Sequence, residues 1–401
     1  MKRIYLHIGL MKTGSTALQE FLAANRTVLA KQNCAYPLMH IGPTHTYDLR
    51  NAHFLIYDSP SNDPARRKAE ELHILQKGIS MLEKAFQEAD TVILSDEKLW
   101  YAQNWLRFRP RLMKIREQFG CEIKVIVYLR RQDQFVESYW NQKVKGASRY
   151  TMSFSEFLLS SHCAGILPDY NAQLDLMREL YGKENIIVRV YEPDQFDGGS
   201  IFSDFMHHTG LALTDEYQFP ESPSNLQLTD NFIEIKRQIN ELTDYRDTDN
   251  FYRAAMLGAS EAAGRIGNEK NDKVTFFPEG GQAAYVEQFR EGNANIAREY
   301  LGREDGVLFH EKIKPLPAWK FNETTFCRDV MLTMAEADIY QQEKIQSANK
   351  RIRQLREENL ELMMKLEKLQ NEVEQLKKNV TSMYRSPIFR AYRKVRSVLK
   401  N

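Results

Sequence analysis

The sequence predicts an α/β protein, with a mostly parallel sheet flanked by helices and a C-terminal coiled-coil helix after it. Short apolar segments alternate with helical patterns over residues 1–310, and a heptad pattern follows further along the chain. Strands that alternate with helices need crossover connections, which produce a parallel sheet covered on both faces. A length of 401 residues with 42% hydrophobic side chains is enough to form a sizeable core.

The predicted strands and helices follow one another in a regular order. Each strand is a short run rich in β-branched residues, and we expect strands at 3–8 (RIYLHI), 34–37 (CAYP), 91–94 (TVIL), 123–129 (IKVIVYL) and 186–190 (IIVRV). Apolar residues recur at helical spacing in the segments ALQEFLAANRTVLAKQN, the stretch after Trp105, RRQDQFVESYWNQKV, 200–208 and EQFREGNANIAREYL.

Charge and cysteine usage exclude several classes of protein. The net charge of +1 provides no overall field that would attract nucleic acid, so we expect no nucleic-acid partner. The 4 cysteines lie far apart without CxxC spacing, which argues against a disulfide scaffold or a zinc site and fits a reducing compartment. We therefore expect no metal site and a cytoplasmic location. The N-terminal apolar run is broken by His7 and Gly9, which is not typical of a signal peptide.

The first strand leads into the segment HIGLMKTGSTAL, which has the features of an anion-binding loop. A loop between a buried strand and a helix start presents free backbone N–H groups and the positive end of the helix dipole. Gly14 permits close approach of the backbone, Lys12 adds a charge, and Thr13, Ser15 and Thr16 add hydroxyl donors. Lys12 precedes the glycine, so the loop differs from the Walker A pattern GK[ST]. The alternative is an ordinary glycine turn capped by hydroxyl residues.

A second anion site is predicted after the strand 123–129. Arg130 lies at the carboxyl end of this strand, where open α/β sheets bind ligands. Ser138 follows eight residues later, a little over two helical turns, on the face nearest the sheet. The alternative for Arg130 is a surface arginine paired with Asp133 or Glu137.

Together, the KTGST loop and the Arg130–Ser138 pair resemble the two cofactor motifs of sulfotransferases that use 3′-phosphoadenosine 5′-phosphosulfate (PAPS), mainly the bacterial type. The resemblance covers about residues 1–310 and implies a P-loop-like, three-layer fold. It implies that residues 12–16 (Lys12, Thr13, Gly14, Ser15 and Thr16) hold the phosphosulfate, and that Arg130 and Ser138 hold the 3′-phosphate. The Arg-Lys-Gly motif of the cytosolic small-molecule enzymes is absent, so the adenine contacts are not assigned.

Sulfuryl transfer needs a cation at the leaving phosphate and a base for the acceptor hydroxyl. Lys12 is the candidate cation. Related sulfotransferases often use a glutamate after the middle strand, so Glu97 is the first candidate base and Asp96 the second. His45 and His53 are alternatives, in a polar segment that follows the second strand. Each of these four residues has a structural alternative, as a helix cap, a solvated residue or a hydrogen-bonded histidine.

The C-terminal part is predicted to form a linker (311–337), a coiled coil (338–380) and a basic amphipathic tail (381–401). Apolar residues alternate in steps of three and four from Ile345 to Val380, with Asn359 filling one core position, which is typical of a parallel dimer. The alternative is a helix packed against the first domain. The tail carries six basic and no acidic residues among aromatic and aliphatic ones. This composition fits an amphipathic helix in peripheral contact with an anionic membrane at its inner face, and the alternative is a disordered basic tail.

The function predicted from these features is transfer of a sulfuryl group from PAPS to an acceptor hydroxyl on a carbohydrate or glycolipid. Two other classes fit part of the pattern. One is a P-loop kinase or nucleotide hydrolase, which the position of Lys12 and the lack of an evident acidic Mg²⁺ site disfavour. The other is a non-catalytic coiled-coil tether with a degenerate nucleotide fold.

Overall fold

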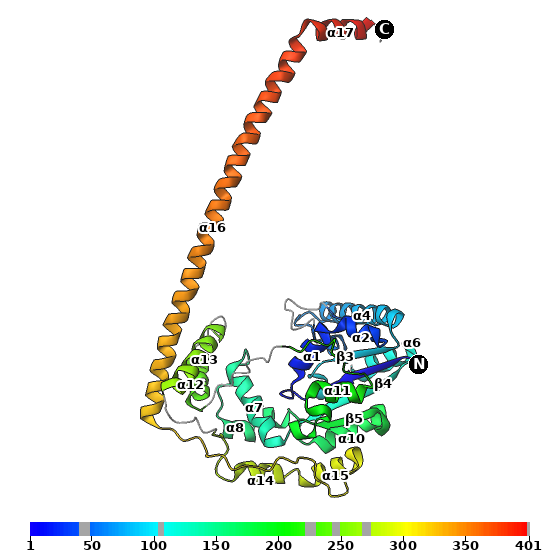
Figure 1. Cartoon of the computed structure of the whole chain (residues 1–401), viewed down its shortest axis with the longest axis vertical. Coiled ribbons are helices and arrows are strands. Elements are labelled where there is room, and N and C mark those ends of the chain that lie inside the picture. Colours follow the sequence, from blue (N-terminus) through cyan, green and yellow to red (C-terminus); the bar gives the residue numbers. More distant parts are fainter. Residues whose placement is uncertain (40–48, 103–107, 221–229, 243–248, 267–273, 399–401) are drawn as a thin grey trace. The chain divides into compact units, whose positions relative to one another are not determined.

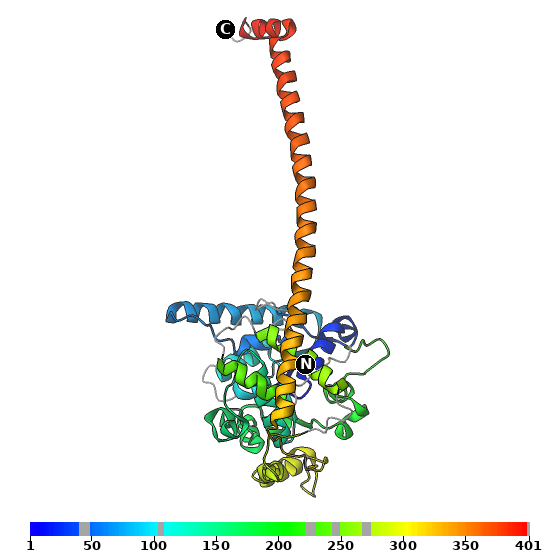
Figure 2. The ribbon, with the colours of Figure 1, turned by 90° about the vertical axis from the view of Figure 1, so that its left-hand side faces the viewer.

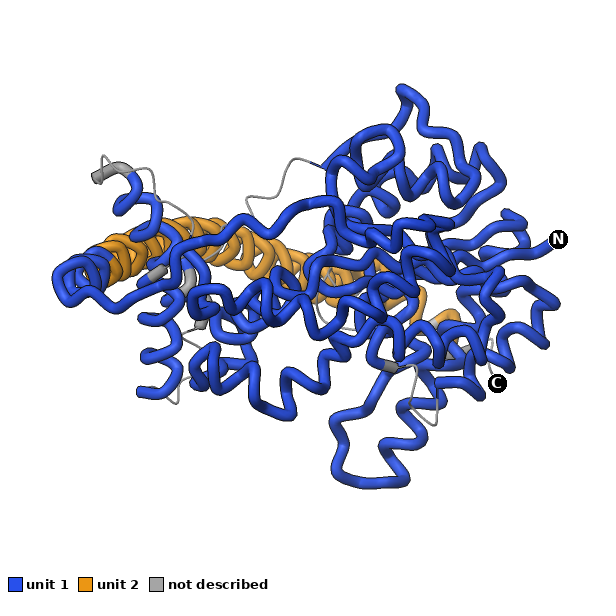
Figure 3. The backbone as a smooth tube through the Cα atoms, turned by 90° about the horizontal axis from the view of Figure 1, so that it is seen from below, with its two compact units in different colours: residues 1–332 blue, residues 333–401 orange. Residues whose placement is uncertain are grey.

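The structure is a computed structural model that describes residues 1–39, 49–102, 108–220, 230–242, 249–266 and 274–398. The chain forms two compact units, Met1–Leu332 and Thr333–Asn401, which Figure 3 draws in different colours. Unit 1 contains the sheet, and unit 2 consists of most of the long C-terminal helix and the helix that follows it.

Unit 1 is built on a five-stranded sheet with the order β2-β3-β1-β4-β5 (Figure 1). All pairings between neighbouring strands are parallel. The strands are β1 (Arg3–His7), β2 (Cys34–Ala35), β3 (Thr91–Ser95), β4 (Glu122–Leu129) and β5 (Ile186–Val190). All five strands agree with the predicted segments to within a few residues, and the predicted α/β class is confirmed.

The sheet lies between two layers of helices. Side chains alternate along β1, so Ile4 and Leu6 belong to one hydrophobic cluster while Tyr5 belongs to the other. On the smaller cluster's face, Tyr5 is grouped with Phe21 of α1 (Ser15–Ala24) and Phe205 of α11 (Ile201–Thr209). Two clusters on opposite faces of one sheet confirm the predicted P-loop-like, three-layer arrangement.

The helices of the first half of unit 1 are α1 (Ser15–Ala24), α2 (Arg26–Lys31), α4 (Pro64–Glu88), α5 (Leu99–Ala102), α6 (Phe108–Phe119) and α7 (Gln132–Lys145), with a 3-10 turn η1 (His53–Leu55). The single helix expected after β1 is divided at Asn25. Its side-chain amide donates to the carbonyls of Phe21 (2.8 Å) and Gln218 (2.7 Å), which ties the break to a distant segment.

Helix α4 was not predicted from the sequence. It has 25 residues and begins at Pro64, and its N-cap Asp63 accepts a hydrogen bond from the Ala65 amide. Figure 2 shows α4 in light blue. This Asp-Pro pair is a common helix start. Its apolar residues Leu75, Ile79, Leu82 and Phe86 recur at steps of three and four, so the face that packs on the sheet was present in the sequence pattern.

The second half of unit 1 is mainly helical. Its helices are α8 (Phe154–Leu159), α9 (Ser161–Ala164), α10 (Tyr170–Tyr181), α11 (Ile201–Thr209), α12 (Asp230–Leu242), α13 (Asp249–Ile266), α14 (Gly281–Glu287) and α15 (Arg290–Leu301). Short 3-10 turns are η2 (Lys183–Asn185), η3 (Pro193–Gln195) and η4 (Asp197–Gly199). The helix expected within EQFREGNANIAREYL is α15.

Unit 1 extends past residue 310, where the sequence placed the end of the first domain. The Trp319 amide donates to the Thr275 carbonyl (2.7 Å), and its indole N–H donates to Asn231 Oδ1 (3.1 Å). Helix α16 (Glu323–Arg385) then begins inside the segment expected to be a linker, and Asn231 donates to Asp329 Oδ2 (2.9 Å). These contacts explain why the compact unit continues to Leu332.

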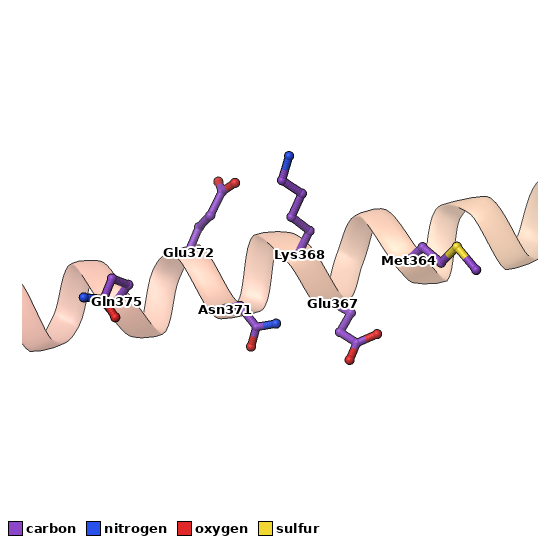
Figure 4. Close-up of a pocket in the computed structure, with 6 residues that line it drawn as sticks. All are labelled: Met364, Glu367, Lys368, Asn371, Glu372 and Gln375. Atoms are coloured by element: carbon purple, nitrogen blue, oxygen red, sulfur yellow. The ribbon is translucent and has the colours of Figure 1, made fainter.

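Unit 2 contains the rest of α16 and α17 (Pro387–Val398). The apolar seam from Ile345 to Val380 lies on α16 and is exposed, with Leu362 62% and Leu376 61% accessible. Figure 4 shows a shallow hollow on this helix that is lined by Met364, Glu367, Lys368, Asn371, Glu372 and Gln375, none of which belongs to the seam. The predicted long C-terminal helix is confirmed, and its pairing with a second copy stays a prediction. Among the described residues, none of the helices is both long enough and apolar enough to cross a membrane.

Candidate functional site

The candidate site lies at the carboxyl edge of the sheet, where β1 and β4 are neighbours. From β1 the chain continues to β2, towards one edge of the sheet. From β4 it continues to β5, towards the opposite edge. Ligands of open α/β sheets bind in the crevice that such a change of direction creates. The loop with Lys12 follows β1, and Arg130 follows β4, so both predicted anion sites border this crevice.

The loop after β1 is held in a compact form that exposes the start of α1. Gly14 is left-handed (φ 72°) and caps α1, and no side chain of the described residues caps the first turn. The Thr13 hydroxyl donates to the Leu10 carbonyl (2.6 Å) and is fully buried, so it holds the loop rather than facing a ligand. Ser15 is also buried, whereas Thr16 is exposed. The uncapped N–H groups of α1 give the loop the geometry of an anion site.

Gly14 approaches neighbouring side chains closely. A Cβ atom on Gly14 would lie 3.2 Å from the hydroxyl oxygen of Tyr191 and 3.1 Å from Ile201 Cδ1. Tyr191 follows β5, and its amide donates to the Leu129 carbonyl (2.7 Å). Three strand ends, those of β1, β4 and β5, therefore meet at this loop.

The two basic residues of the crevice are in direct contact through the backbone. Arg130 Nη1 donates to the Lys12 carbonyl (3.0 Å), and its Nε donates to Gln134 Oε1 (3.2 Å). Burial, with the nearby charge of Arg130, lowers the pKa of Lys12, and burial likewise lowers the pKa of Arg130. Two cations held this close in a partly desolvated place favour a negatively charged ligand.

Ser138 lies on α7, in the helix that Arg130 precedes. Its hydroxyl oxygen is buried and has no hydrogen-bond partner among the described residues. The adjacent Glu137 accepts from the Thr275 hydroxyl (3.0 Å) and the Phe276 amide (2.6 Å), which fixes this part of α7. No hydrogen bond joins Ser138 to Arg130 in the described part of the chain, so any shared role would pass through a ligand.

Asp96 and Glu97, after β3, occupy different environments although they are neighbours. Asp96 is fully buried, and its Oδ2 lies 2.8 Å from His53 Nδ1, while Oδ1 accepts from Arg50 Nη2 (2.5 Å) and from the Lys98 amide (2.8 Å). Burial opposes ionisation, but the His53 hydrogen bond and the Arg50 charge together lower the pKa of Asp96. Asp96 is thus a buried anion that orients His53 and Arg50.

Glu97 is half-buried beside the loop after β1. It accepts from Gln19 Nε2 (3.3 Å), and its Oε1 lies 3.5 Å from Arg50 Nη1. Burial, with the charge of Asp96, raises the pKa of Glu97. A Cβ atom on Gly9 would lie 2.8 Å from Glu97 Cβ, so the loop after β1 passes directly over this residue. A carboxylate with a raised pKa beside an anion loop suits a general base.

The structure brings together most of the residues that the sequence selected. Lys12 and Arg130 share one crevice edge, and Asp96, Glu97 and His53 form one cluster beside the loop. His45 lies outside the described residues. Trp140, on α7, is fully buried, and its indole N–H donates to the Met152 carbonyl (3.0 Å).

Four polar residues of the cluster were missed by sequence reasoning: Gln19, Ser95, His7 and Arg50. Gln19 donates to Ser95 Oγ (3.0 Å) as well as to Glu97, and Ser95 Oγ lies 2.8 Å from His7 Nδ1. Arg50 contacts both carboxylates. A polar residue on the buried face of an otherwise apolar helix was the available signal for Gln19. Arg50 had none, because its contact depends on a loop distant in sequence.

Carboxylate and imidazole ligand atoms also come together at Asp197, Asp204 and His208, within 4.8 Å of one another. Arg189 Nε lies 3.1 Å from both carboxylate oxygens of Asp204, and its Nη2 lies 3.5 Å from Asp197 Oδ2. The Tyr128 hydroxyl donates to Asp204 Oδ2 (2.7 Å). The guanidinium already supplies the positive charge, so this group is an ion-pair network that joins β4, β5 and α11.

No family model matches the chain. An uncharacterised protein of Archaeoglobus fulgidus is 28% identical over 204 residues, which are 50% of this chain and 52% of that protein. The chain thus matches about half the length of this curated relative. A crystal structure of a sulfotransferase from Alicyclobacillus acidocaldarius aligns with 65% of this chain and 96% of its own, at a TM-score of 0.37 and 17% identity. The function proposed below therefore rests on the geometry of the site.

Proposed function

We propose that this chain is a sulfotransferase that moves a sulfuryl group from PAPS to an acceptor hydroxyl. The observation that carries the proposal is the contact between Arg130 Nη1 and the Lys12 carbonyl at the β1–β4 crevice (3.0 Å). This contact supports two adjacent binding sites on the protein, each with a cation. Together they would bind one ligand that carries negative charge at two places. PAPS has this property, with a 3′-phosphate and a 5′-phosphosulfate.

The first site suits the phosphosulfate end of the donor. The uncapped N–H groups at the start of α1 would bind oxygen atoms of the 5′ group. Lys12 would stabilise the charge that develops on the departing phosphate oxygen, a role worth several kcal/mol for a preorganised cation, about 3–4 by analogy with a single oxyanion donor. Arg130, with the Ser138 hydroxyl that finds no partner among the described residues, would bind the 3′-phosphate.

Proton transfer is assigned to Glu97. As the acceptor oxygen bonds to sulfur, its O–H proton would pass to Glu97, while the bond from sulfur to the bridging phosphate oxygen breaks and its electrons stay on the phosphate. The raised pKa of Glu97 makes it a stronger base than an exposed glutamate. Asp96, the second candidate base, is fully buried and would act by orienting His53, which is an alternative base.

The acceptor we propose is a hydroxyl group on a carbohydrate or a glycolipid. The basic and aromatic C-terminal segment supports an acceptor at a membrane surface, and the resemblance of the two motifs is to bacterial enzymes. We place the reaction in the cytoplasm, where the 4 cysteines, which form no disulfide in this structure, would stay reduced. A panel of saccharide and glycolipid acceptors with radiolabelled PAPS would identify the class.

A homodimer through α16 is part of the proposal. The large apolar residues of the seam are 45–62% exposed in the single chain, for example Ile352 at 45% and Leu362 at 62%, which leaves an apolar stripe in water. Pairing with a second copy would bury it, and Asn359 would set the parallel register.

The test is calorimetric titration with 3′,5′-adenosine bisphosphate and, separately, with ATP and magnesium. We expect micromolar or tighter binding of the bisphosphate and its release during turnover. Binding of ATP with magnesium alone would favour the kinase or nucleotide hydrolase. Absence of binding of either nucleotide would favour the non-catalytic tether.

A further inference from the structure

The helix α17 begins with a defined cap and stands apart from the seam of α16. Pro387 occupies its first position, and the Ser386 hydroxyl accepts from the Phe389 amide (3.2 Å). Arg390 also donates to the Arg385 carbonyl (2.7 Å), so the junction with α16 is held by hydrogen bonds. The heptad steps end at Val380, before this junction. α17 is therefore a separate helix with its own surface.

One face of α17 is apolar and exposed. Ile388 is 83% exposed, Tyr392 56% and Val395 58%. Their spacing of four and three residues places them on a single face of the helix. Exposure of this apolar stripe to water is unfavourable, because the free energy falls when apolar side chains move from water to an apolar environment.

The other face of α17 is basic. Arg390, Arg393 and Arg396 alternate with the apolar residues along the sequence and fall mainly on the opposite side of the helix. Residues 381–401 contain no Asp or Glu. Arginine side chains can keep their charged ends in a polar layer while their stems cover apolar surface. The segment therefore combines an apolar face with a positive one.

We infer that α17 binds the surface of an anionic lipid bilayer, with Ile388, Tyr392 and Val395 in the acyl boundary and the arginines among the head groups. Its 12 residues extend about 18 Å, too short for the roughly 30 Å hydrocarbon core, so it would lie in the interface plane. Charge complementarity selects anionic head groups. The apolar face selects a bilayer over nucleic acid, which has no apolar layer to receive it. This inference does not depend on the proposed transferase activity.

The test is flotation of the full chain with vesicles of phosphatidylcholine containing one quarter phosphatidylglycerol, compared with vesicles of phosphatidylcholine alone. We expect binding to the anionic vesicles only. Each basic residue is expected to raise the affinity about fivefold at low salt, so binding should weaken as salt increases.

Two double variants separate the faces, each with a matched control on α16. Ile388→Ser with Tyr392→Ser should lower the vesicle affinity at least tenfold, whereas Leu360→Ser with Met364→Ser, also four residues apart and exposed, should leave it unchanged. Arg393→Glu with Arg396→Glu should abolish binding, whereas Lys368→Glu with Lys378→Glu makes the same change in net charge and should retain most of it.

Circular dichroism checks that each variant keeps its helix content, so a loss of binding can be assigned to the surface. Equal binding to neutral and anionic vesicles, or unchanged binding by both α17 variants, would overturn the inference. Retention on an oligonucleotide with no flotation would also overturn it, in favour of a nucleic-acid partner.

Discussion

Gly9→Ala tests whether the loop after β1 depends on its close approach to Glu97. Gly9 has a φ of 92°, and a Cβ atom there would lie 2.8 Å from Glu97 Cβ and 2.9 Å from Glu97 Cα. The left-handed backbone costs an alanine about 1–2 kcal/mol. Overlap with a backbone atom that cannot rotate away adds about 1–3 kcal/mol. We expect Gly9→Ala to lower the free energy of unfolding of unit 1 by about 2–5 kcal/mol.

Gly210→Ala is the matched control. Gly210 also has a left-handed backbone, with a φ of 71°, but a Cβ atom there meets no atom of the described segments within 4 Å. It should cost only the backbone contribution, about 1–2 kcal/mol. Urea unfolding followed by fluorescence measures both variants, and titration with 3′,5′-adenosine bisphosphate should show weaker binding for Gly9→Ala only. Equal stabilities of the two variants, with equal nucleotide affinity, would refute the reasoning.

Four further predictions concern the site, the core and α16. Lys12→Ala and Arg130→Ala should each abolish PAPS-dependent transfer, and calorimetry should show weaker binding of the bisphosphate; full binding by either would remove that residue from the site. Glu97→Gln should slow turnover by about 10²–10⁴-fold while nucleotide still binds, with exposed Glu88→Gln as control, and a normal rate would exclude Glu97 as the base. Burial lowers the pKa of His7 from 6.5 to about 4. Between pH 6.5 and pH 4, His7 therefore takes up a proton in the unfolded chain but not in the folded chain. Stability should therefore fall between pH 6.5 and 4 by about 3 kcal/mol more in the parent than in His7→Asn, and parallel pH curves would contradict this. Leu362→Glu, in the seam, should shift the chain from dimer to monomer in sedimentation experiments, whereas Leu360→Glu, similarly exposed but outside the seam, should not; a monomeric parent chain would reject the coiled coil.

The sheet could be predicted from sequence because each strand is a short apolar run with a helix after it. A buried parallel strand needs apolar side chains on both faces, and this leaves a local signal at 91–94 and 186–190. The loop at Lys12 and the position of Arg130 at a strand end followed from the same pattern. Proximity of the two sites required the order of the strands, and their contact is seen only in the three-dimensional structure.

The different environments of Asp96 and Glu97 could not be predicted. The two carboxylates are adjacent in the chain, and sequence reasoning ranked Glu97 first through the resemblance alone. Their difference arises from Arg50 and His53, which approach from a separate loop, and from Gln19 on α1. Contacts between segments more than 40 residues apart leave no periodic signal, so this part of the site had to come from the structure.

The edge of the sheet at β2 bears on how the chain behaves while it folds. β2 contains only two residues, and Pro37 follows shortly after it, without an N–H group to extend the ladder. A neighbouring molecule that met this edge would find room for very few backbone hydrogen bonds. The short β2 edge therefore disfavours strand pairing between two chains that are still folding. It also lowers the tendency of the folded protein to aggregate through this edge of the sheet, even when no other subunit covers it.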